Sequence, residues 1–179
     1  MSRARLTPFS YVILVLVGRN GAGPHDLVRM MRQGRVYWTA AESQYYAEPK
    51  RLEKLGYLSS RKEPGRTRER THYELTGKGR EALAEWVAQP APLPKIQSEP
   101  VVRLMATDLV EPERVLEGLA ALRAEIDEQK KGLEVGESIA AELPHRERYL
   151  RINHRLARAF LDAHLEWLEQ AERELKDGR

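Results

Sequence analysis

The sequence of 179 residues predicts a mainly α-helical fold that contains one short two-stranded ribbon. Apolar residues recur at helical spacing along most of the chain, which favours helices. Two short segments, at about 57–62 and 70–75, flank a charged Pro-Gly turn and predict the ribbon. The Pro-rich segment 90–98 predicts a stiff linker between two domains, residues 1–89 and 99–179.

The first helix is expected over about residues 8–19. Thr7 can cap it, and Pro8 suits the first helical position, where no backbone donor is needed. Arginines before an apolar run could instead indicate a signal peptide. The cap and the following Asn20-Gly21 turn favour a buried helix, and the run is too short to span a bilayer.

A second helix is expected from His25 to Gln33, and a third over about 40–55, with Thr39 as its cap. Pro49 lies inside the third helix, where it removes a backbone donor and crowds the preceding turn. We therefore expect that this helix is kinked at Pro49 or has a shorter regular part.

After the ribbon, Thr76 can cap a further helix over about 77–88. Three short helices, a two-stranded ribbon and another helix follow one another in the order of a winged helix-turn-helix. The sequence therefore predicts a winged helix-turn-helix domain over residues 1–89.

The second domain is predicted to be helical. A short helix is expected near 99–108, and a longer one from Pro112 to about Pro144. The longer one carries an interrupted heptad seam of Val115, Leu119, Leu122, Ile126 and Leu133. The last helix, about 145–176, carries an apolar stripe of Tyr149, Ile152, Leu156, Phe160, Ala163, Trp167 and Ala171, widened by Leu150, Leu161, Leu165 and Leu168. Because one neighbouring helix cannot cover so wide a stripe, residues 99–179 are predicted to form a coiled-coil-like dimerisation domain.

The net charge of +3 is unevenly distributed. Residues 1–88 carry 16 Lys and Arg against 9 Asp and Glu, whereas residues 89–179 carry 14 against 18. This asymmetry indicates that the first domain meets a polyanion and the second meets protein. The chain has no cysteine, which excludes disulfides and thiolate zinc sites and fits the predicted cytoplasmic location.

The third helix and the ribbon are the predicted DNA-binding elements. The outward face of the helix carries hydroxyl, amide and cationic groups that suit base edges and phosphates in a major groove. The ribbon tip has several cations around its turn and can reach a backbone or minor groove. The alternative for each element is an ordinary solvated surface. The candidate contacts are Thr39, Ser43, Gln44, Tyr46, Lys50, Arg51, Lys54, Arg61, Lys62, Arg66, Arg68 and Arg70.

Several segments together resemble the PadR family of transcriptional regulators, in its longer branch. The similar segments are Leu6 to Leu14, His25-Asp26-Leu27, Trp38 with Ser43 to Tyr46, Leu52 to Leu58, and Tyr73 to Leu83. The resemblance implies a regulator whose C-terminal helices form a homodimer. It also implies a planar aromatic effector near the dimer interface. Trp86 and Trp167 are the candidate contacts, and simple packing is the alternative for each tryptophan.

Other chemistry is not predicted. The C-terminal histidines match no zinc spacing, and no supported catalytic triad is present, so we expect no metal, no cofactor and no enzymatic activity. The sequence thus favours a dimeric, non-membrane DNA-binding repressor on an inverted-repeat operator. The alternative is a winged-helix protein-interaction adaptor that is assembled by its coiled coil.

Overall fold

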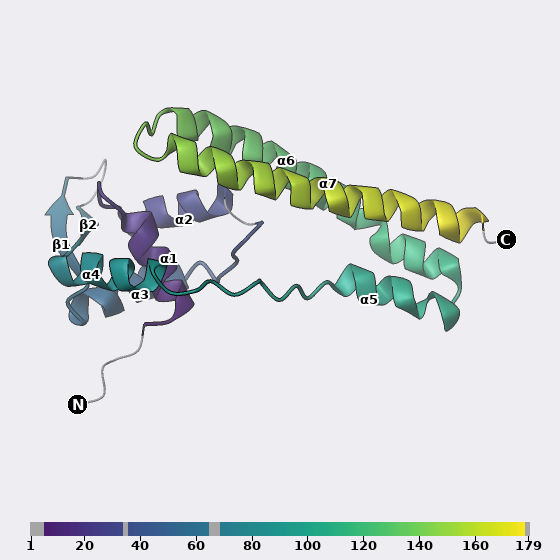
Figure 1. Cartoon of the computed structure of the whole chain (residues 1–179), viewed down its shortest axis with the longest axis horizontal. Helices are drawn as coiled ribbons and strands as arrows, with labels where there is room; N and C mark the ends of the chain where they lie inside the picture. Colours follow the sequence, from purple (N-terminus) through teal and green to yellow (C-terminus); the bar gives the residue numbers. More distant parts are fainter. Residues whose placement is uncertain (1–5, 34–35, 65–68, 178–179) are drawn as a thin grey trace. The chain divides into compact units, whose positions relative to one another are not determined.

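The computed structural model describes residues 6–33, 36–64 and 69–177 (Figure 1). The chain divides into two compact units. The N-terminal unit comprises residues 1–34 and 38–92, and the C-terminal unit comprises residues 35–37 and 93–179. The fold is mainly helical with one two-stranded sheet, as the sequence predicts.

The N-terminal unit is a winged helix-turn-helix. Its elements are α1 (Pro8–Val17), α2 (Pro24–Gln33), α3 (Gln44–Lys54), β1 (Leu58–Glu63), β2 (Arg70–Leu75) and α4 (Gly77–Val87). The strands pair antiparallel, from Leu58 opposite Leu75 to Glu63 opposite Arg70. Their core-facing side chains join Ile13, Leu14, Leu27, Leu52 and other apolar residues of the three helices in one buried cluster.

Two caps that the sequence predicts are present. The Thr7 hydroxyl accepts a hydrogen bond from the Ser10 N–H, and the Ser10 hydroxyl accepts one from the Thr7 N–H, so the start of α1 is a reciprocal capping box. The Thr76 hydroxyl caps α4 by accepting from the Gly79 N–H at 3.1 Å. α1 ends sooner than the expected residue 19, because Gly18 adopts a positive φ of 54° directly after Val17.

The predicted start of the third helix is wrong. α3 begins at Gln44 rather than near residue 40, and Ser43, not Thr39, occupies the N-cap position. The Gln44 N–H donates to the Ala41 carbonyl at 2.9 Å, so residues 41–44 form a turn before the helix. The capping hydroxyl of Thr39 predicts the earlier start, but the connector before α3 is held by a tertiary contact: Trp38 stacks on Phe9 of α1 with 6.4 Å between ring centroids.

α3 continues through Pro49 to Lys54. Pro49 is buried together with Tyr45 and Leu52, so its ring contributes to the core. The regular helix is therefore shorter than the predicted 40–55 at its N-terminal end, and the proline lies within it. Packing of this buried face offsets the cost of the missing backbone donor.

In the C-terminal unit, α5 (Glu99–Met105) and the short 3₁₀ helix η1 (Ala106–Asp108) precede two long helices, α6 (Pro112–Ala141) and α7 (Glu147–Asp177). The long helices lie side by side as a hairpin (Figure 1). Two buried clusters join them. One contains Ile126, Leu133, Ala157 and Leu161, and the other contains Val115, Leu119 and Leu168.

This packing divides the predicted apolar stripe of the last helix. The heptad seam of α6 is covered by α7 of the same chain, through Ala157, Leu161 and Leu168. By contrast, Tyr149, Ile152 and Leu156 are 64%, 49% and 62% exposed. The first half of the stripe therefore remains an exposed apolar surface in the single chain, whereas its second half packs in the intrachain hairpin.

The core face of α3 gives a first test of this fold. We expect Leu52→Ala to lower the free energy of unfolding by about 2–5 kcal/mol, because Leu52 is fully buried and its truncation leaves a cavity. Lys54→Ala, two residues further on the exposed side, should change it by less than about 0.5 kcal/mol. Urea denaturation of the two variants measures the difference, and similar values for both would contradict the burial of this face.

Candidate nucleic-acid interface

The exposed side of α3 presents a row of polar and cationic groups. Gln44, Lys50 and Lys54 are exposed, as is Ser43 at the N-cap, whereas Tyr45, Pro49 and Leu52 are buried. Residues with these side chains can donate to base edges or pair with phosphates. The helix thus holds one face in the core and leaves the other face available for a ligand.

Two further candidates lie near this row. Tyr46 is half-buried, and its hydroxyl is 3.0 Å from Nδ1 of His25, so it bridges α3 and α2. The two rings also meet edge to face at 5.5 Å between centroids. Thr39 is exposed in the connector before α3 and does not cap the helix.

Arg51 points toward its own domain. Its Nε donates to Oε2 of Glu48 at 2.8 Å, and its Nη2 donates to Oε1 of Glu48 at 2.6 Å. The same Nη2 donates to the Ser10 hydroxyl of α1 at 2.9 Å. Burial raises the pKa of Glu48, but hydrogen bonds from Arg51 and Ser10 and the charge of Arg51 outweigh it, so the pKa of this carboxyl is lowered.

Sequence reasoning missed the roles of Ser10 and Glu48. Glu48 is a single carboxylate on the otherwise apolar core face of the helix, three residues before Arg51. That spacing places two side chains together on a helix, so it is a signal for an ion pair. The serine partner is 38 residues away in sequence and is brought to Glu48 only by the packing of α1 against α3.

Two arginines in the described part of the wing pair with carboxylates of the wing itself. Arg61 pairs with Glu63 at 2.6 Å and with Glu74, and Arg70 pairs with Glu63 at 3.3 Å. Lys62 donates to the Thr71 hydroxyl at 3.1 Å. The hydrogen bond from Arg61, followed by the nearby positive charges, lowers the pKa of Glu63. Arg66 and Arg68, predicted at the wing tip, lie outside the described residues.

The basic start of α4 is used within the domain. Lys78 Nζ donates to the Leu55 carbonyl at 2.6 Å and lies 4.4 Å from the centre of the Tyr57 ring. Arg80 donates to the Leu75 carbonyl at 2.7 Å. Both side chains therefore brace the junction between α3, the wing and α4.

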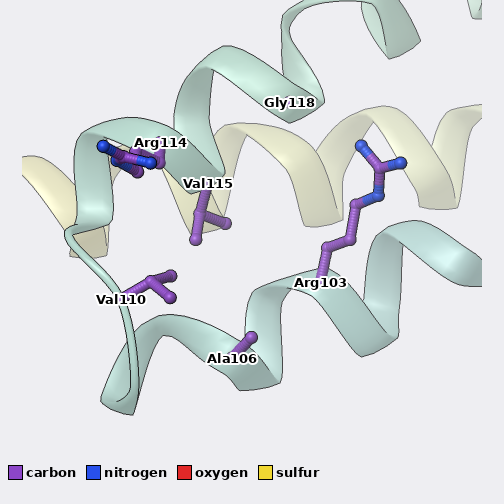
Figure 2. A pocket seen from close by; sticks show the side chains of 6 residues that line it. All are labelled: Arg103, Ala106, Val110, Arg114, Val115 and Gly118. Carbon is purple, nitrogen blue, oxygen red and sulfur yellow. The ribbon is translucent and has the colours of Figure 1, made fainter.

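The two candidate effector residues lie in different units. Trp86 stacks flat on Tyr11 of α1, with 4.7 Å between ring centroids, and remains 37% exposed. Trp167 is half-buried and packs against the Val115, Leu119 and Leu168 cluster. A separate pocket of about 210 Å³ lies between α5, η1 and α6 (Figure 2). It is lined by Arg103, Ala106, Val110, Arg114, Val115 and Gly118, and neither tryptophan contributes to it.

Residues 6–33, 36–64 and 69–177 contain neither a metal-binding cluster nor a membrane-spanning helix. No group of three or more His, Asp or Glu side chains in these ranges is placed to hold a metal ion. No helix in the same ranges is both long and apolar enough to cross a membrane.

Comparison with known proteins places this geometry in context. Residues 14–85 match the transcriptional regulator PadR-like family. No curated protein matches the sequence. Among solved structures, the chain is similar to the Vibrio cholerae virulence activator AphA, with 26% identity and a TM-score of 0.73 over 95% of this chain and 99% of that chain.

Two further solved structures share the fold. Bacillus subtilis PadR in complex with operator DNA has 20% identity and a TM-score of 0.78, over 96% of this chain and 99% of that chain. A PadR-like transcriptional regulator from Bacillus cereus has 15% identity and a TM-score of 0.75, over 95% of this chain and 99% of that chain. The likeness covers both units of the chain.

The wing carboxylates generate a second test. We expect Glu63→Gln to raise the affinity for duplex DNA of any sequence and to steepen its salt dependence, because Arg70 loses its carboxylate and becomes available to phosphates, while Arg61 keeps only Glu74. Glu128→Gln, the same charge change at an exposed position of α6, is the control. Fluorescence anisotropy over a series of salt concentrations compares the two variants, and equal effects would show that wing pairing does not limit binding.

Proposed function

Because its N-terminal domain, matched over residues 14–85, belongs to the PadR-like family of transcriptional regulators, we propose that this protein represses transcription as a homodimer on specific DNA. The observation that carries the proposal is the exposed polar face of α3 beside a cationic wing, in a domain of this family. The protein would act in the cytoplasm and would have no enzymatic activity.

The proposed contacts divide into base readers and phosphate contacts. Gln44 and Ser43 at the start of α3 would read base edges, as helices of this type do with their N-terminal residues. Lys50 and Lys54 carry charge further along the same face and would meet bases or phosphates. The wing cations, including Arg66 and Arg68 at its tip, would contact backbone or minor groove. Thr39 and Tyr46 would supply flanking contacts.

A second copy of this chain is the proposed partner of the C-terminal unit. The exposed Tyr149, Ile152 and Leu156 of α7 form an apolar row that single helices of monomeric proteins seldom leave in water. Further exposed apolar residues on and beside α5 are Val101, Val102, Met105, Leu109 and Val110. A two-fold dimer would place two α3 helices on an inverted-repeat operator, with half-sites about 34–36 Å apart.

An effector is part of the proposal. The structure of Bacillus subtilis PadR has been solved in complex with p-coumaric acid. That PadR chain has 18% identity to this one and a TM-score of 0.68, over 94% of this chain and 98% of that chain. We propose that a small aromatic compound releases this protein from DNA. Trp86 and Trp167 are the candidate contacts, because aromatic rings stack well on planar ligands.

The main test compares wing and helix variants on DNA. We expect wild-type affinity to fall steeply with salt, and Arg66→Ala/Arg68→Ala to weaken binding to all sequences while lowering the salt slope by about one unit for each phosphate contact. Gln44→Ala should leave the slope unchanged and lose roughly 1–3 kcal/mol of discrimination at one base pair per half-site. Gel-shift titrations on selected and scrambled duplexes measure both quantities.

Each part of this proposal has its own contrary outcome. Salt-independent wild-type binding would remove DNA as the partner and favour the adaptor role instead. If Arg66→Ala/Arg68→Ala left the salt dependence of binding unchanged, these two arginines would not contact DNA.

The dimer is tested separately. We expect the wild-type protein to be dimeric at micromolar concentration, and Ile152→Glu/Leu156→Glu to shift it toward monomer, because two buried charges would oppose apolar association. Glu174→Gln, an exposed change elsewhere on α7, should leave the dimer intact. Light scattering gives the mass of each variant, and a wild-type monomer would refute the proposed assembly.

A further inference from the structure

Three side chains of α1 and α3 form a compact polar cluster inside the N-terminal unit. The Ser10 hydroxyl of α1 donates to Oε1 of Glu48 at 2.7 Å. Arg51 holds both carboxylate oxygens of Glu48 and also donates to the Ser10 hydroxyl at 2.9 Å. We refer to these residues as the Ser10–Glu48–Arg51 cluster.

The cluster uses the full hydrogen-bonding capacity of its serine. Ser10 is completely buried. A hydroxyl donates once and accepts twice. This one donates to Glu48 and accepts from Arg51 and from the Thr7 N–H at 2.9 Å, and it also lies 3.0 Å from the Thr7 hydroxyl. The cap of α1 and the middle of α3 are therefore tied through one oxygen atom.

The charges of the cluster depend on each other. The Glu48 side chain is only 13% exposed, whereas the Arg51 side chain is 39% exposed. A buried carboxylate needs a partner, and removing the partner is far more disruptive than replacing both groups. The fork of Arg51 meets the two oxygens of Glu48 in the bidentate arrangement, which fixes direction as well as distance.

Directional contacts matter because the buried face of α3 is otherwise apolar. Outside the cluster, the directional contacts of α3 include those of Tyr46 with His25 and of Glu53 with Ser60. Tyr45, Pro49 and Leu52 are held by burial, which favours no particular orientation of the helix. A small rotation of α3 could keep these residues covered. It would break the hydrogen bonds of the cluster, so the cluster selects one orientation.

We propose that the Ser10–Glu48–Arg51 cluster is a positioning device that holds the recognition helix α3 in one orientation on α1, and that Arg51 acts through it rather than by contacting DNA. This inference rests on the proposed function, since it takes α3 as the helix that reads bases. It replaces the expectation that Arg51 is a direct contact. Lys50 and Lys54, on either side of Arg51 in sequence, remain the cations of the exposed face.

The test separates a positioning role from a phosphate contact. The variants are Arg51→Gln and Glu48→Gln/Arg51→Gln, with Lys54→Gln as the matched control, which removes the same charge from the exposed face of the same helix. The probes are a duplex selected from genomic DNA by the wild-type protein and a scrambled duplex of equal length. Affinity for each probe is measured over a series of salt concentrations.

We expect Arg51→Gln to reduce the preference for the selected duplex by about tenfold, an effect within the range measured for residues in contact. The salt slope of this variant should equal that of the wild type. Glu48→Gln/Arg51→Gln should recover most of the preference, because two amides and the Ser10 hydroxyl can share neutral hydrogen bonds. Lys54→Gln should weaken both probes and lower the slope by about one unit.

Three results would overturn the inference. Arg51→Gln could behave as Lys54→Gln does, which would make Arg51 a phosphate contact. The double variant could be no better than the single one, which would show that the two charges are not coupled. Equal wild-type affinity for both probes would refute the proposed function itself, and the wild-type measurement identifies that case.

A further variant covers the possibility that Arg51→Gln does not fold, which circular dichroism reveals. Ser10→Ala removes the hydroxyl that joins the helices but leaves the ion pair of Glu48 and Arg51 within α3. We expect Ser10→Ala to lose less of the preference for the selected duplex than Arg51→Gln does, and to keep the salt slope of the wild type. An unchanged preference in Ser10→Ala would overturn the inference on its own.

Discussion

The whole N-terminal unit depends on the burial of one face of α3 against α1. An isolated helix as short as Gln44–Lys54, with a proline inside it, is not stable in water. It exists here because Tyr45, Pro49 and Leu52 enter the core. The same burial turns Lys50 and Lys54 outward, so the constraint that forms the helix also creates the surface that we propose for DNA.

Charge in this protein is arranged in two ways. Some cations are held by carboxylates or carbonyls of their own domain, as Arg51, Arg61 and Lys78 are. Others, such as Lys50 and Lys54, stand on the exposed face of α3. Only cations of the second kind can release counterions from DNA without first breaking an internal contact. The net charge therefore overstates the number of cations that can bind a polyanion without losing a contact inside the protein.

In the C-terminal unit, one helix carries both a packed and an exposed apolar surface. The later part of α7 covers the seam of α6 within the chain, and its earlier part leaves Tyr149 and Leu156 exposed. An intrachain hairpin and an exposed apolar surface thus share one continuous helix. This division supports the proposed homodimer.

Sequence alone determined the fold class, because hydrophobic periodicity and the Thr7 and Thr76 caps are local signals that the chain carries without a partner. It also placed Lys50 on the outward face of the third helix, where the structure has it exposed, since helical spacing sets which residues share a face. The start of α3 depended on tertiary structure, because Trp38 is anchored on a distant helix. So did the hydrogen bond from Arg51 to Ser10, because the two residues are 41 positions apart and no local pattern encodes a contact that only the packing of two helices creates.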